Sequence, residues 1–172
     1  MTALNETKWL IAREIPRLRR YALTLAESPE AADDLVQDTL ERAIRKRHLW
    51  QGRGSMRSWL YRILFNVFAN QKTGRRRRRE EMDIEDAPAT PIAPTQEQTL
   101  ACRDIAEALR CLPIEQRAAI ALVGLEGLPY DEAAAALGIP VGTLRSRLSR
   151  GRDQLRHLYP ASSDIPHLRR VK

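Results

Sequence analysis

The segment from Tyr130 to Leu155, YDEAAAALGIPVGTLRSRLSRGRDQL, constrains the fold of this chain more than any other. A short Ala-rich stretch is followed by Gly138 and then by a longer stretch that carries several arginines. Ala134 lies four residues before Gly138, so a small side chain falls where two helices would cross and a flexible residue falls where the chain would reverse. The second stretch has an apolar stripe at helical spacing, made of Leu144, Leu148, Gly151 and Leu155. The pattern predicts a helix-turn-helix.

The second of these helices has a polar face opposite its apolar stripe. At about 100° per residue, that face carries Arg145, Ser146, Ser149 and Arg150. A helix with a packed back and an Arg/Ser front is shaped to lie in the major groove of DNA. An ordinary amphipathic helix with solvated arginines remains the alternative for this segment taken alone.

Charge is distributed unevenly along the chain. The net charge of +7 favours a polyanionic partner. A basic block spans Arg75–Arg79, and acidic residues gather in Asp33–Glu41 and Glu80–Glu107. From residue 140 onwards only Asp153 and Asp164 oppose the basic residues, which are Arg145, Arg147, Arg150, Arg152, Arg156, Arg169, Arg170 and Lys172.

Composition and motifs exclude several classes of protein. No stretch reaches the roughly 18 apolar residues that a membrane span needs, and no signal-peptide core begins the chain, so we expect a cytoplasmic protein without membrane insertion. Cys102 and Cys111 form no CxxC pair and have no histidine cluster nearby, which favours buried or half-buried thiols over a metal site. We find no phosphate-binding glycine loop and no nucleophile–base pair, so neither an enzyme nor a cofactor is expected.

The chain divides into two helical parts. The stretch from Arg75 to about Thr99 combines a basic run, an acidic run and three prolines without an apolar period, which is typical of a linker. We therefore predict an all-α fold of two small domains joined by a flexible linker. The predicted boundaries are a first domain at 8–76, a linker at 77–98, a second domain at 99–159 and a tail, expected to be disordered, at 160–172.

The first domain is expected to hold three helices, at Lys8–Ala26, Pro29–Leu49 and Met56–Thr73. Pro16 is expected to kink the first or to start its second portion. Ser28 followed by Pro29 is a start signal for the second. The residues expected in the core are Leu18, Tyr21, Ala22 and Leu25 from the first helix, Leu35, Val36, Thr39, Leu40, Ala43 and Ile44 from the second, and Trp59, Leu60, Ile63, Leu64 and Val67 from the third.

Two polar or aromatic features of this domain have open interpretations. Asp34, Gln37, Asp38 and Glu41 form an acidic stripe, for which periodicity alone favours a plain solvated face. Trp50 precedes a GRGS turn and a basic helix on which Arg62, Asn66 and Asn70 share one face. A base of single-stranded nucleic acid can stack on such a ring, and filling the core is an equally good interpretation.

Three segments together resemble a known family. Ala32–Ala43, Ser55–Val67 and Tyr130–Leu155 are similar, in order and spacing, to region 2 and region 4 of bacterial sigma-70 family sigma factors of the extracytoplasmic-function (ECF) group. The resemblance extends from about Ile15 to Leu158. The segment Leu112–Ala134 and the third helix resemble the general-stress (EcfG-like) subgroup.

The resemblance implies partners for the first domain. In the family, region 2 docks on the clamp helices of the largest subunit of core RNA polymerase, which implies polymerase contacts for Asp34, Gln37 and Asp38. The loop before the third helix holds a flipped base of the −10 element. This implies −10 DNA contacts for Trp50, Asn66 and Arg62.

For the second domain the resemblance implies reading of the −35 element as duplex, with the polymerase flap as a further partner. The implied −35 contacts are Tyr130, Asp131, Arg145, Ser146, Ser149 and Arg150, and the implied phosphate contacts are Arg147, Arg152 and Arg156. The chain departs from the family at Pro129, where a Ser or Thr capping residue is common, and proline offers no capping oxygen. The acidic linker, with Glu80, Glu81, Asp83, Glu85 and Asp86, is compatible with the basic channel through which the family's linker runs.

The resemblance also implies an anti-sigma partner that covers these faces. The rival interpretation is a stand-alone helix-turn-helix repressor or activator, whose N-terminal domain would serve dimerisation or ligand sensing. The absence of a heptad seam or ligand-pocket chemistry in the first half disfavours that rival.

Overall fold

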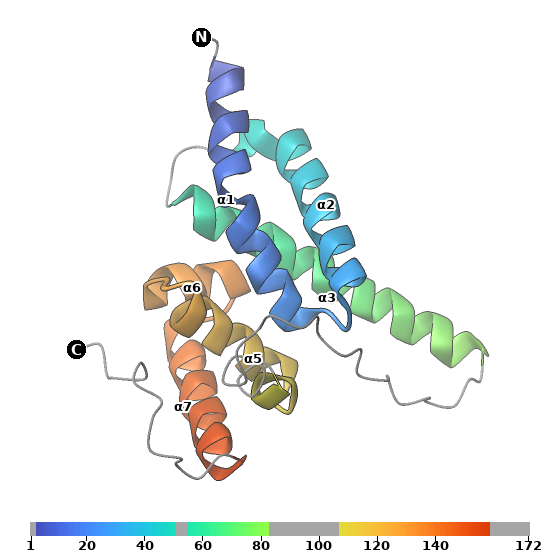
Figure 1. Ribbon diagram of the computed structural model, residues 1–172, viewed down its shortest axis with the longest axis vertical. Coiled ribbons are helices and arrows are strands. Elements are labelled where there is room, and N and C mark those ends of the chain that lie inside the picture. The colour runs from blue at the N-terminus through green and yellow to red at the C-terminus, as the bar shows by residue number, and fades with distance from the viewer. Residues whose placement is uncertain (1–2, 51–54, 83–106, 159–172) are drawn as a thin grey trace, which may run out of the picture.

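The computed structural model describes residues 3–50, 55–82 and 107–158, and every element within these ranges is a helix (Figure 1). This confirms the all-α prediction. An N-terminal unit contains α1 (Ala3–Leu25), α2 (Pro29–Lys46), the short 3-10 helix η1 (Arg47–Leu49) and α3 (Met56–Met82). A C-terminal unit contains α5 (Ile114–Ile120), the π-helical turn η2 (Ala121–Leu125), α6 (Tyr130–Leu137) and α7 (Val141–Leu158).

Helix α1 is one continuous element. It runs through Pro16, so the expectation that this proline starts a second helical portion is wrong. The residue before Pro16 and the turn around it remain helical because α1 buries Ile11, Leu18, Tyr21 and Leu25 on one side, and this packing outweighs the lost backbone bond.

Helix α2 begins where the sequence predicts. The Ala31 amide donates to Ser28 Oγ at 3.2 Å, and Pro29 occupies the first turn. The α-helix ends at Lys46, and η1 completes the predicted span as a tighter turn. Its buried residues are Ala32, Leu35, Val36, Thr39 and Ala43, whereas Ile44, which we expected in the core, is 40% exposed. Ile44 lies at the edge of the apolar stripe, where the neighbouring helices no longer cover it.

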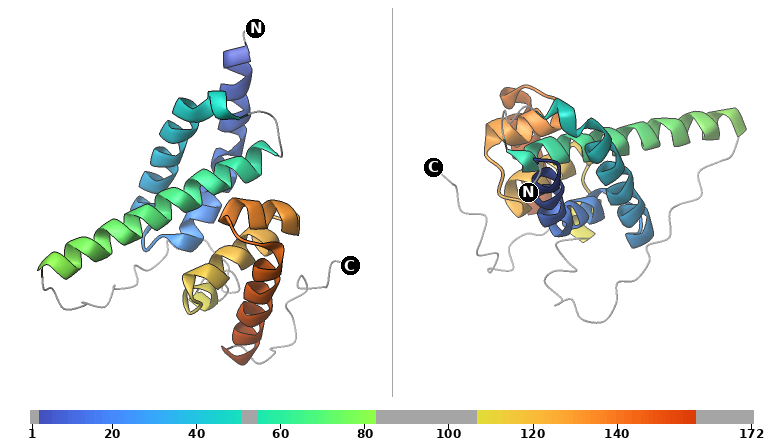
Figure 2. Two further views of the ribbon diagram at one scale, coloured as in Figure 1. Left: turned by 180° about the vertical axis from the view of Figure 1, so that it is seen from behind. Right: turned by 90° about the horizontal axis from the view of Figure 1, so that it is seen from above.

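Helix α3 continues to Met82 and does not end near Thr73. Arginine and glutamate are good helix formers, so the basic and acidic runs extend the helix into the stretch predicted to be linker. Its C-terminal half projects beyond the rest of the N-terminal unit (Figure 2). Its first half packs in the core through Leu60, Tyr61, Leu64 and Val67, and the Tyr61 ring meets the Tyr21 ring edge-on at 5.1 Å.

The helix-turn-helix is present in the C-terminal unit. Helix α6 ends at Gly138, whose φ of 66° is left-handed, and the Ile139 amide closes the turn by donating to the Ala134 carbonyl at 3.0 Å. Gly151 is buried where α7 meets α5: a Cβ there would lie 2.6 Å from Ile120 Cδ1. The close approach of α5 and α7 therefore depends on a glycine at this position.

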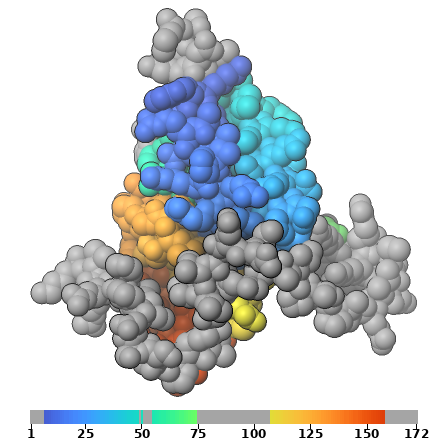
Figure 3. Space-filling view, in the orientation of Figure 1, coloured from blue at the N-terminus to red at the C-terminus, as the bar shows by residue number. Residues whose placement is uncertain are grey.

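The two units pack against each other. Helix α3 contacts α6, and α1 contacts both α5 and η2. Figure 3 shows the same junction as a continuous surface where the blue α1 meets the orange part of the C-terminal unit.

Several predictions concern residues that the structure does not describe. These are the tail at 160–172, Cys102 and residues 83–98 of the proposed linker. Cys111 is described and exposed, so the expectation of a buried thiol is wrong for it: it lies in the turn just before Pro113. None of the described helices is both long and apolar enough to cross a membrane.

Candidate nucleic-acid interface

The polar face of α7 is open to solvent. Arg145, Ser146, Ser149 and Arg150 are all exposed, while Leu144 and Leu148 on the opposite face are buried. Arg150 lies along its own helix, with Nε 3.3 Å from the Ser146 carbonyl and Nη2 3.3 Å from Ser146 Oγ. These long hydrogen bonds are weak, so the guanidinium can leave them for a stronger acceptor at little cost.

The arginines flanking this face differ in surroundings. Arg147 and Arg152 are half-exposed, and Arg156 is exposed and donates to Asp153 Oδ1 at 2.6 Å. An exposed pair of this kind contributes little stability, so Arg156 remains available to an anionic partner.

The start of α6 is partly covered. Tyr130 is half-buried and packs against the core, whereas Asp131 is exposed. Pro129 occupies the N-cap position, and no side chain caps this helix. Helix α6 therefore begins without the side-chain cap that a Ser or Thr in place of Pro129 would offer.

The residues of the acidic stripe on α2 differ in exposure. Asp34 and Gln37 are exposed, while Asp38 is half-buried and accepts a hydrogen bond from Gln71 Nε2 of α3 at 3.0 Å. Asp38 thus also ties α2 to α3. Gln37 donates to Glu41 Oε1 at 3.4 Å along the same helix.

Trp50 follows η1 and is half-buried. Its indole nitrogen is buried without a hydrogen-bond partner, so the ring does not project freely into solvent. Arg62 and Asn66, predicted to act with it, lie on the exposed face of α3. The segment that joins Trp50 to α3 includes residues 51–54, which lie outside the described residues.

Sequence reasoning missed the polar cluster between the two units. Glu126, in the C-terminal unit, has a side chain only 1% exposed. It accepts from Arg20 Nε at 2.6 Å, from Arg20 Nη2 at 2.9 Å and from the Tyr61 hydroxyl at 2.6 Å. We name Glu126, Arg20 and Tyr61 the Glu126 cluster. The one sequence signal for it is a carboxylate within the apolar run LVGLEGL.

The surroundings of the Glu126 cluster keep its two hydrogen-bond donors, Tyr61 and Arg20, protonated. Burial and the hydrogen bond to Glu126 raise the pKa of Tyr61 far above its usual range, so its hydroxyl stays protonated and donates. The hydrogen bond to Glu126 also raises the pKa of Arg20, which is always charged. Glu126 therefore accepts two charge-assisted hydrogen bonds from the Arg20 guanidinium and a third hydrogen bond from the neutral Tyr61 hydroxyl.

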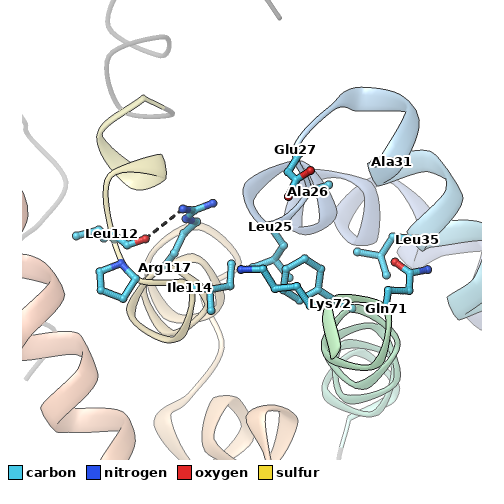
Figure 4. Close-up of a pocket in the computed structure, with 12 residues that line it drawn as sticks. Leu25, Ala26, Glu27, Ala31, Leu35, Gln71, Lys72, Leu112, Ile114 and Arg117 are labelled. Atoms are coloured by element: carbon cyan, nitrogen blue, oxygen red, sulfur yellow. Dashed lines mark hydrogen bonds between the residues drawn. The ribbon is translucent and has the colours of Figure 1, made fainter. Parts of the chain in front are cut away.

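A cavity of about 350 Å³ also lies between the units (Figure 4). Apolar side chains from both units line it, among them Leu25, Phe68 and Ile114. Arg117 stands at its edge and donates to the carbonyls of Leu112 at 3.1 Å and Thr24 at 3.4 Å. Burial lowers the pKa of Arg117, and its Nε is buried without a partner.

Comparison with known proteins places both units in one family. Residues 11–65 match the description "Sigma2 domain of PhyR", and residues 102–155 match "Sigma-70, region 4". The ECF RNA polymerase sigma factor EcfG of Rhodopseudomonas palustris is 39% identical over 84% of this chain and 80% of its own length. The chain belongs to the ECF sigma factors of the sigma-70 family. These proteins direct RNA polymerase to promoters and are not enzymes, as the sequence predicted.

Two further relatives also match most of this chain. The ECF sigma factor SigE of Mycolicibacterium smegmatis is 39% identical over 86% of this chain and 59% of its own length. The sigma factor RpoE of Bartonella quintana, solved in complex with the anti-sigma factor NepR, has 35% identity and a TM-score of 0.82. That match covers 91% of this chain and 98% of RpoE, so it includes both units.

Proposed function

We propose that this sigma factor reads promoters through two separate surfaces and serves a general-stress regulon in the cytoplasm. The −35 surface is the polar face of α7 with the start of α6, formed by Tyr130, Asp131, Arg145, Ser146, Ser149 and Arg150. The −10 surface is Trp50 with Arg62 and Asn66. The similarity to EcfG supports the stress assignment.

The observation that carries the −35 assignment is the two-sided character of α7. Its back is buried through Leu144 and Leu148, and its front presents exposed arginine and serine side chains. Arginine can form a bidentate contact to guanine O6 and N7, and serine accepts or donates to either base type. We assign phosphate contacts to Arg147, Arg152 and Arg156, whose guanidinium groups are half-exposed or exposed on the same helix.

On the N-terminal unit we propose that Asp34, Gln37 and Asp38 contact the clamp helices of core polymerase. Asp34 and Gln37 are exposed on the outer side of α2 and suit a basic partner. Asp38 is held by Gln71, so its contribution includes fixing α2 relative to α3.

We further propose an anti-sigma partner that inserts apolar side chains into the cavity between the units. Support comes from the similarity to RpoE, which was solved with NepR, and from the apolar side chains that both units contribute to a lining that also includes Glu27, Gln71 and Lys72. Ile114→Asp would weaken binding of a NepR-like anti-sigma factor of the same genome and leave promoter-directed transcription intact. Unchanged anti-sigma affinity would contradict the cavity as the docking site.

The function is tested by multi-round transcription with purified core polymerase and a genomic promoter pool, with and without this protein. We expect new, specific transcripts whose start sites share −35 and −10 elements and lie upstream of stress genes. Absence of transcripts, combined with tight binding to a duplex site without polymerase, would instead support the stand-alone repressor.

A further inference from the structure

The arginine block Arg75–Arg79 has no part in the surfaces proposed above. Its five residues lie on α3, which remains helical to Met82. From Lys72 to Glu81 the helix carries six cationic residues and two anionic ones, Glu80 and Glu81, which gives a net charge of +4. More than half of the net charge of the chain, +7, is therefore concentrated in one short segment.

The arginine block lies on the part of α3 that leaves the body of the molecule. The first half of the helix is packed through Leu64 and Val67, whereas Thr73 and Gly74 are exposed. A Cβ added at Gly74 would meet nothing within 4 Å. Beyond this residue the helix projects from the N-terminal unit (Figure 2). Within the described residues, no neighbouring helix therefore fills the space around α3 where the block begins.

The arrangement of the block suits a phosphate backbone better than base edges. Successive residues of an α-helix are about 100° apart, so five consecutive positions go fully round the helix axis. A partner therefore meets arginine positions from whichever side it approaches. Arginine is always charged and binds phosphate through a planar fork of donors. Charge without a distinct face fits phosphates, which carry no sequence information of their own.

The block shares its helix with the proposed −10 surface, to which α3 contributes Arg62 and Asn66. Arg75 follows Asn66 by nine residues and Arg79 follows it by thirteen. At about 1.5 Å per residue, the block begins about 14 Å and ends about 20 Å beyond Asn66 along the axis. Duplex DNA rises about 3.4 Å per base pair, so the block reaches about four to six base pairs from a base held at Asn66. The chain then continues from α3 to the unit proposed to read the −35 element, which favours the duplex between the two elements as the partner.

We propose that the arginine block of α3 is a further DNA-binding site of this sigma factor, which holds phosphates of the spacer duplex between the −10 and −35 elements. The location of the site on the promoter rests on the proposed function. The block adds affinity by counterion release and reads no bases. Because about half of the positions around a helix can face one partner, roughly two or three of the five arginines contact phosphates at a time.

A matched pair of variants tests the site. In the glutamine variant all five arginines of the block are replaced by glutamine, which removes the charge and keeps good helix formers in place. In the lysine variant all five are replaced by lysine, which keeps the charge. Helix content, measured by circular dichroism, should equal that of the wild type in both variants.

The measurement is the affinity of the assembled polymerase holoenzyme for a promoter fragment over a series of salt concentrations. Each phosphate contact contributes about 0.9 to the slope of log affinity against log salt, so the glutamine variant should lower the magnitude of that slope by about 2. The lysine variant should keep the wild-type slope. An unchanged slope in the glutamine variant would overturn the proposal. An equal loss of slope in both variants would also overturn it, because counterion release requires only the charge.

Neutral methylphosphonate linkages in the spacer locate the partner of the block. They should lower the promoter affinity of the wild-type holoenzyme to about the level of the glutamine variant, and lower the affinity of that variant little further. Spacer linkages that weaken both proteins equally would overturn the proposal, and this comparison does not depend on how well the variant folds.

Core polymerase is the other macromolecule that the block could contact. The affinity of the glutamine variant for core polymerase should equal that of the wild type. A loss of core affinity, with unchanged promoter affinity of the assembled holoenzyme, would assign the block to polymerase and overturn the DNA site. Absence of transcripts in the transcription test would defeat the proposed function, whereas a promoter-bound holoenzyme with an unchanged salt slope would defeat the arginine block alone.

Discussion

The two proposed DNA-reading surfaces differ in how they are exposed. The polar face of α7 is complete in the free chain, with its arginines solvated and held by weak hydrogen bonds within their own helix. The −10 surface lies beside the junction with α6, and the ring of Trp50 is half-buried. The proposed −35 face of α7 is therefore fully exposed, whereas the proposed −10 surface is exposed at Arg62 and Asn66 and half-buried at Trp50.

The two proposed surfaces suit two different forms of DNA. A duplex is read from outside by a rigid helix on a packed back, which the sequence specifies locally. An unpaired base is held only after a strand has opened, and a site for it can remain partly covered until polymerase is bound.

The largest effect is expected for Arg145→Ala combined with Arg150→Ala. Each guanidinium that forks onto a base contributes about 1–3 kcal/mol, so the double variant should lower −35-dependent promoter binding by tenfold or much more. Promoter affinity of the polymerase holoenzyme measures this. Arg156→Ala is the control, because loss of a phosphate contact should weaken all sequences alike and reduce the salt slope by about 1. If the double variant behaves like Arg156→Ala, the assigned α7 face does not read bases.

The next effect concerns Trp50. Stacking on an aromatic ring stabilises an unpaired base by about 1–3 kcal/mol, so Trp50→Ala should reduce open-complex formation while core polymerase binding is unchanged. Trp50→Phe keeps a ring and should retain most of the activity. A parallel loss of thermal stability and core binding in Trp50→Ala would show that the ring fills the fold, the interpretation that its half-burial keeps open.

Packing behind the α7 surface is tested at Gly151. Two extra carbons beyond a Cβ that already meets Ile120 at 2.6 Å should overpack the α5–α7 contact, and Gly151→Val should destabilise the chain by about 1–3 kcal/mol. Thermal unfolding followed by circular dichroism measures it. Gly142→Val, on the same helix with open space around it, is the control and should be nearly neutral. Equal melting temperatures for the two variants would contradict the close approach.

The smallest effect is expected at the start of α2. Ser28→Ala removes the cap to the Ala31 amide and should cost about 1 kcal/mol, while Ser28→Gly should cost only a few tenths. Urea unfolding compares the two. Unchanged stability of Ser28→Ala would show that the serine oxygen does not cap the helix.

Features with local signals could be predicted from the sequence. The cap at Ser28, the turn at Gly138 and the stripe of Leu144 and Leu148 each depend on residues within one or two helical turns. The resemblance to ECF sigma factors likewise rested on three continuous segments. The exposure of the polar face of α7 could be predicted because the opposite face carries the apolar stripe.

Features that depend on tertiary packing were not predictable. Arg20 and Glu126 are 106 residues apart, and no periodicity connects them. Tyr61 is fully buried on a helix where Trp59, the more apolar candidate, is only half-buried, because α3 packs against α1 and α6 at once. Helix α3 extends to Met82 because the charged run favours a helix, although its lack of an apolar period suggested a linker.

The roles proposed for the two surfaces are tested most directly by permanganate footprinting of a promoter obtained from the transcription experiment. Permanganate modifies unpaired thymines, so it reports opening at the −10 element. We expect reactive −10 thymines only when core polymerase and the sigma factor are both present, and much weaker reactivity with Trp50→Ala. Reactive −10 thymines with the free sigma factor, or none with the complete holoenzyme, would contradict it.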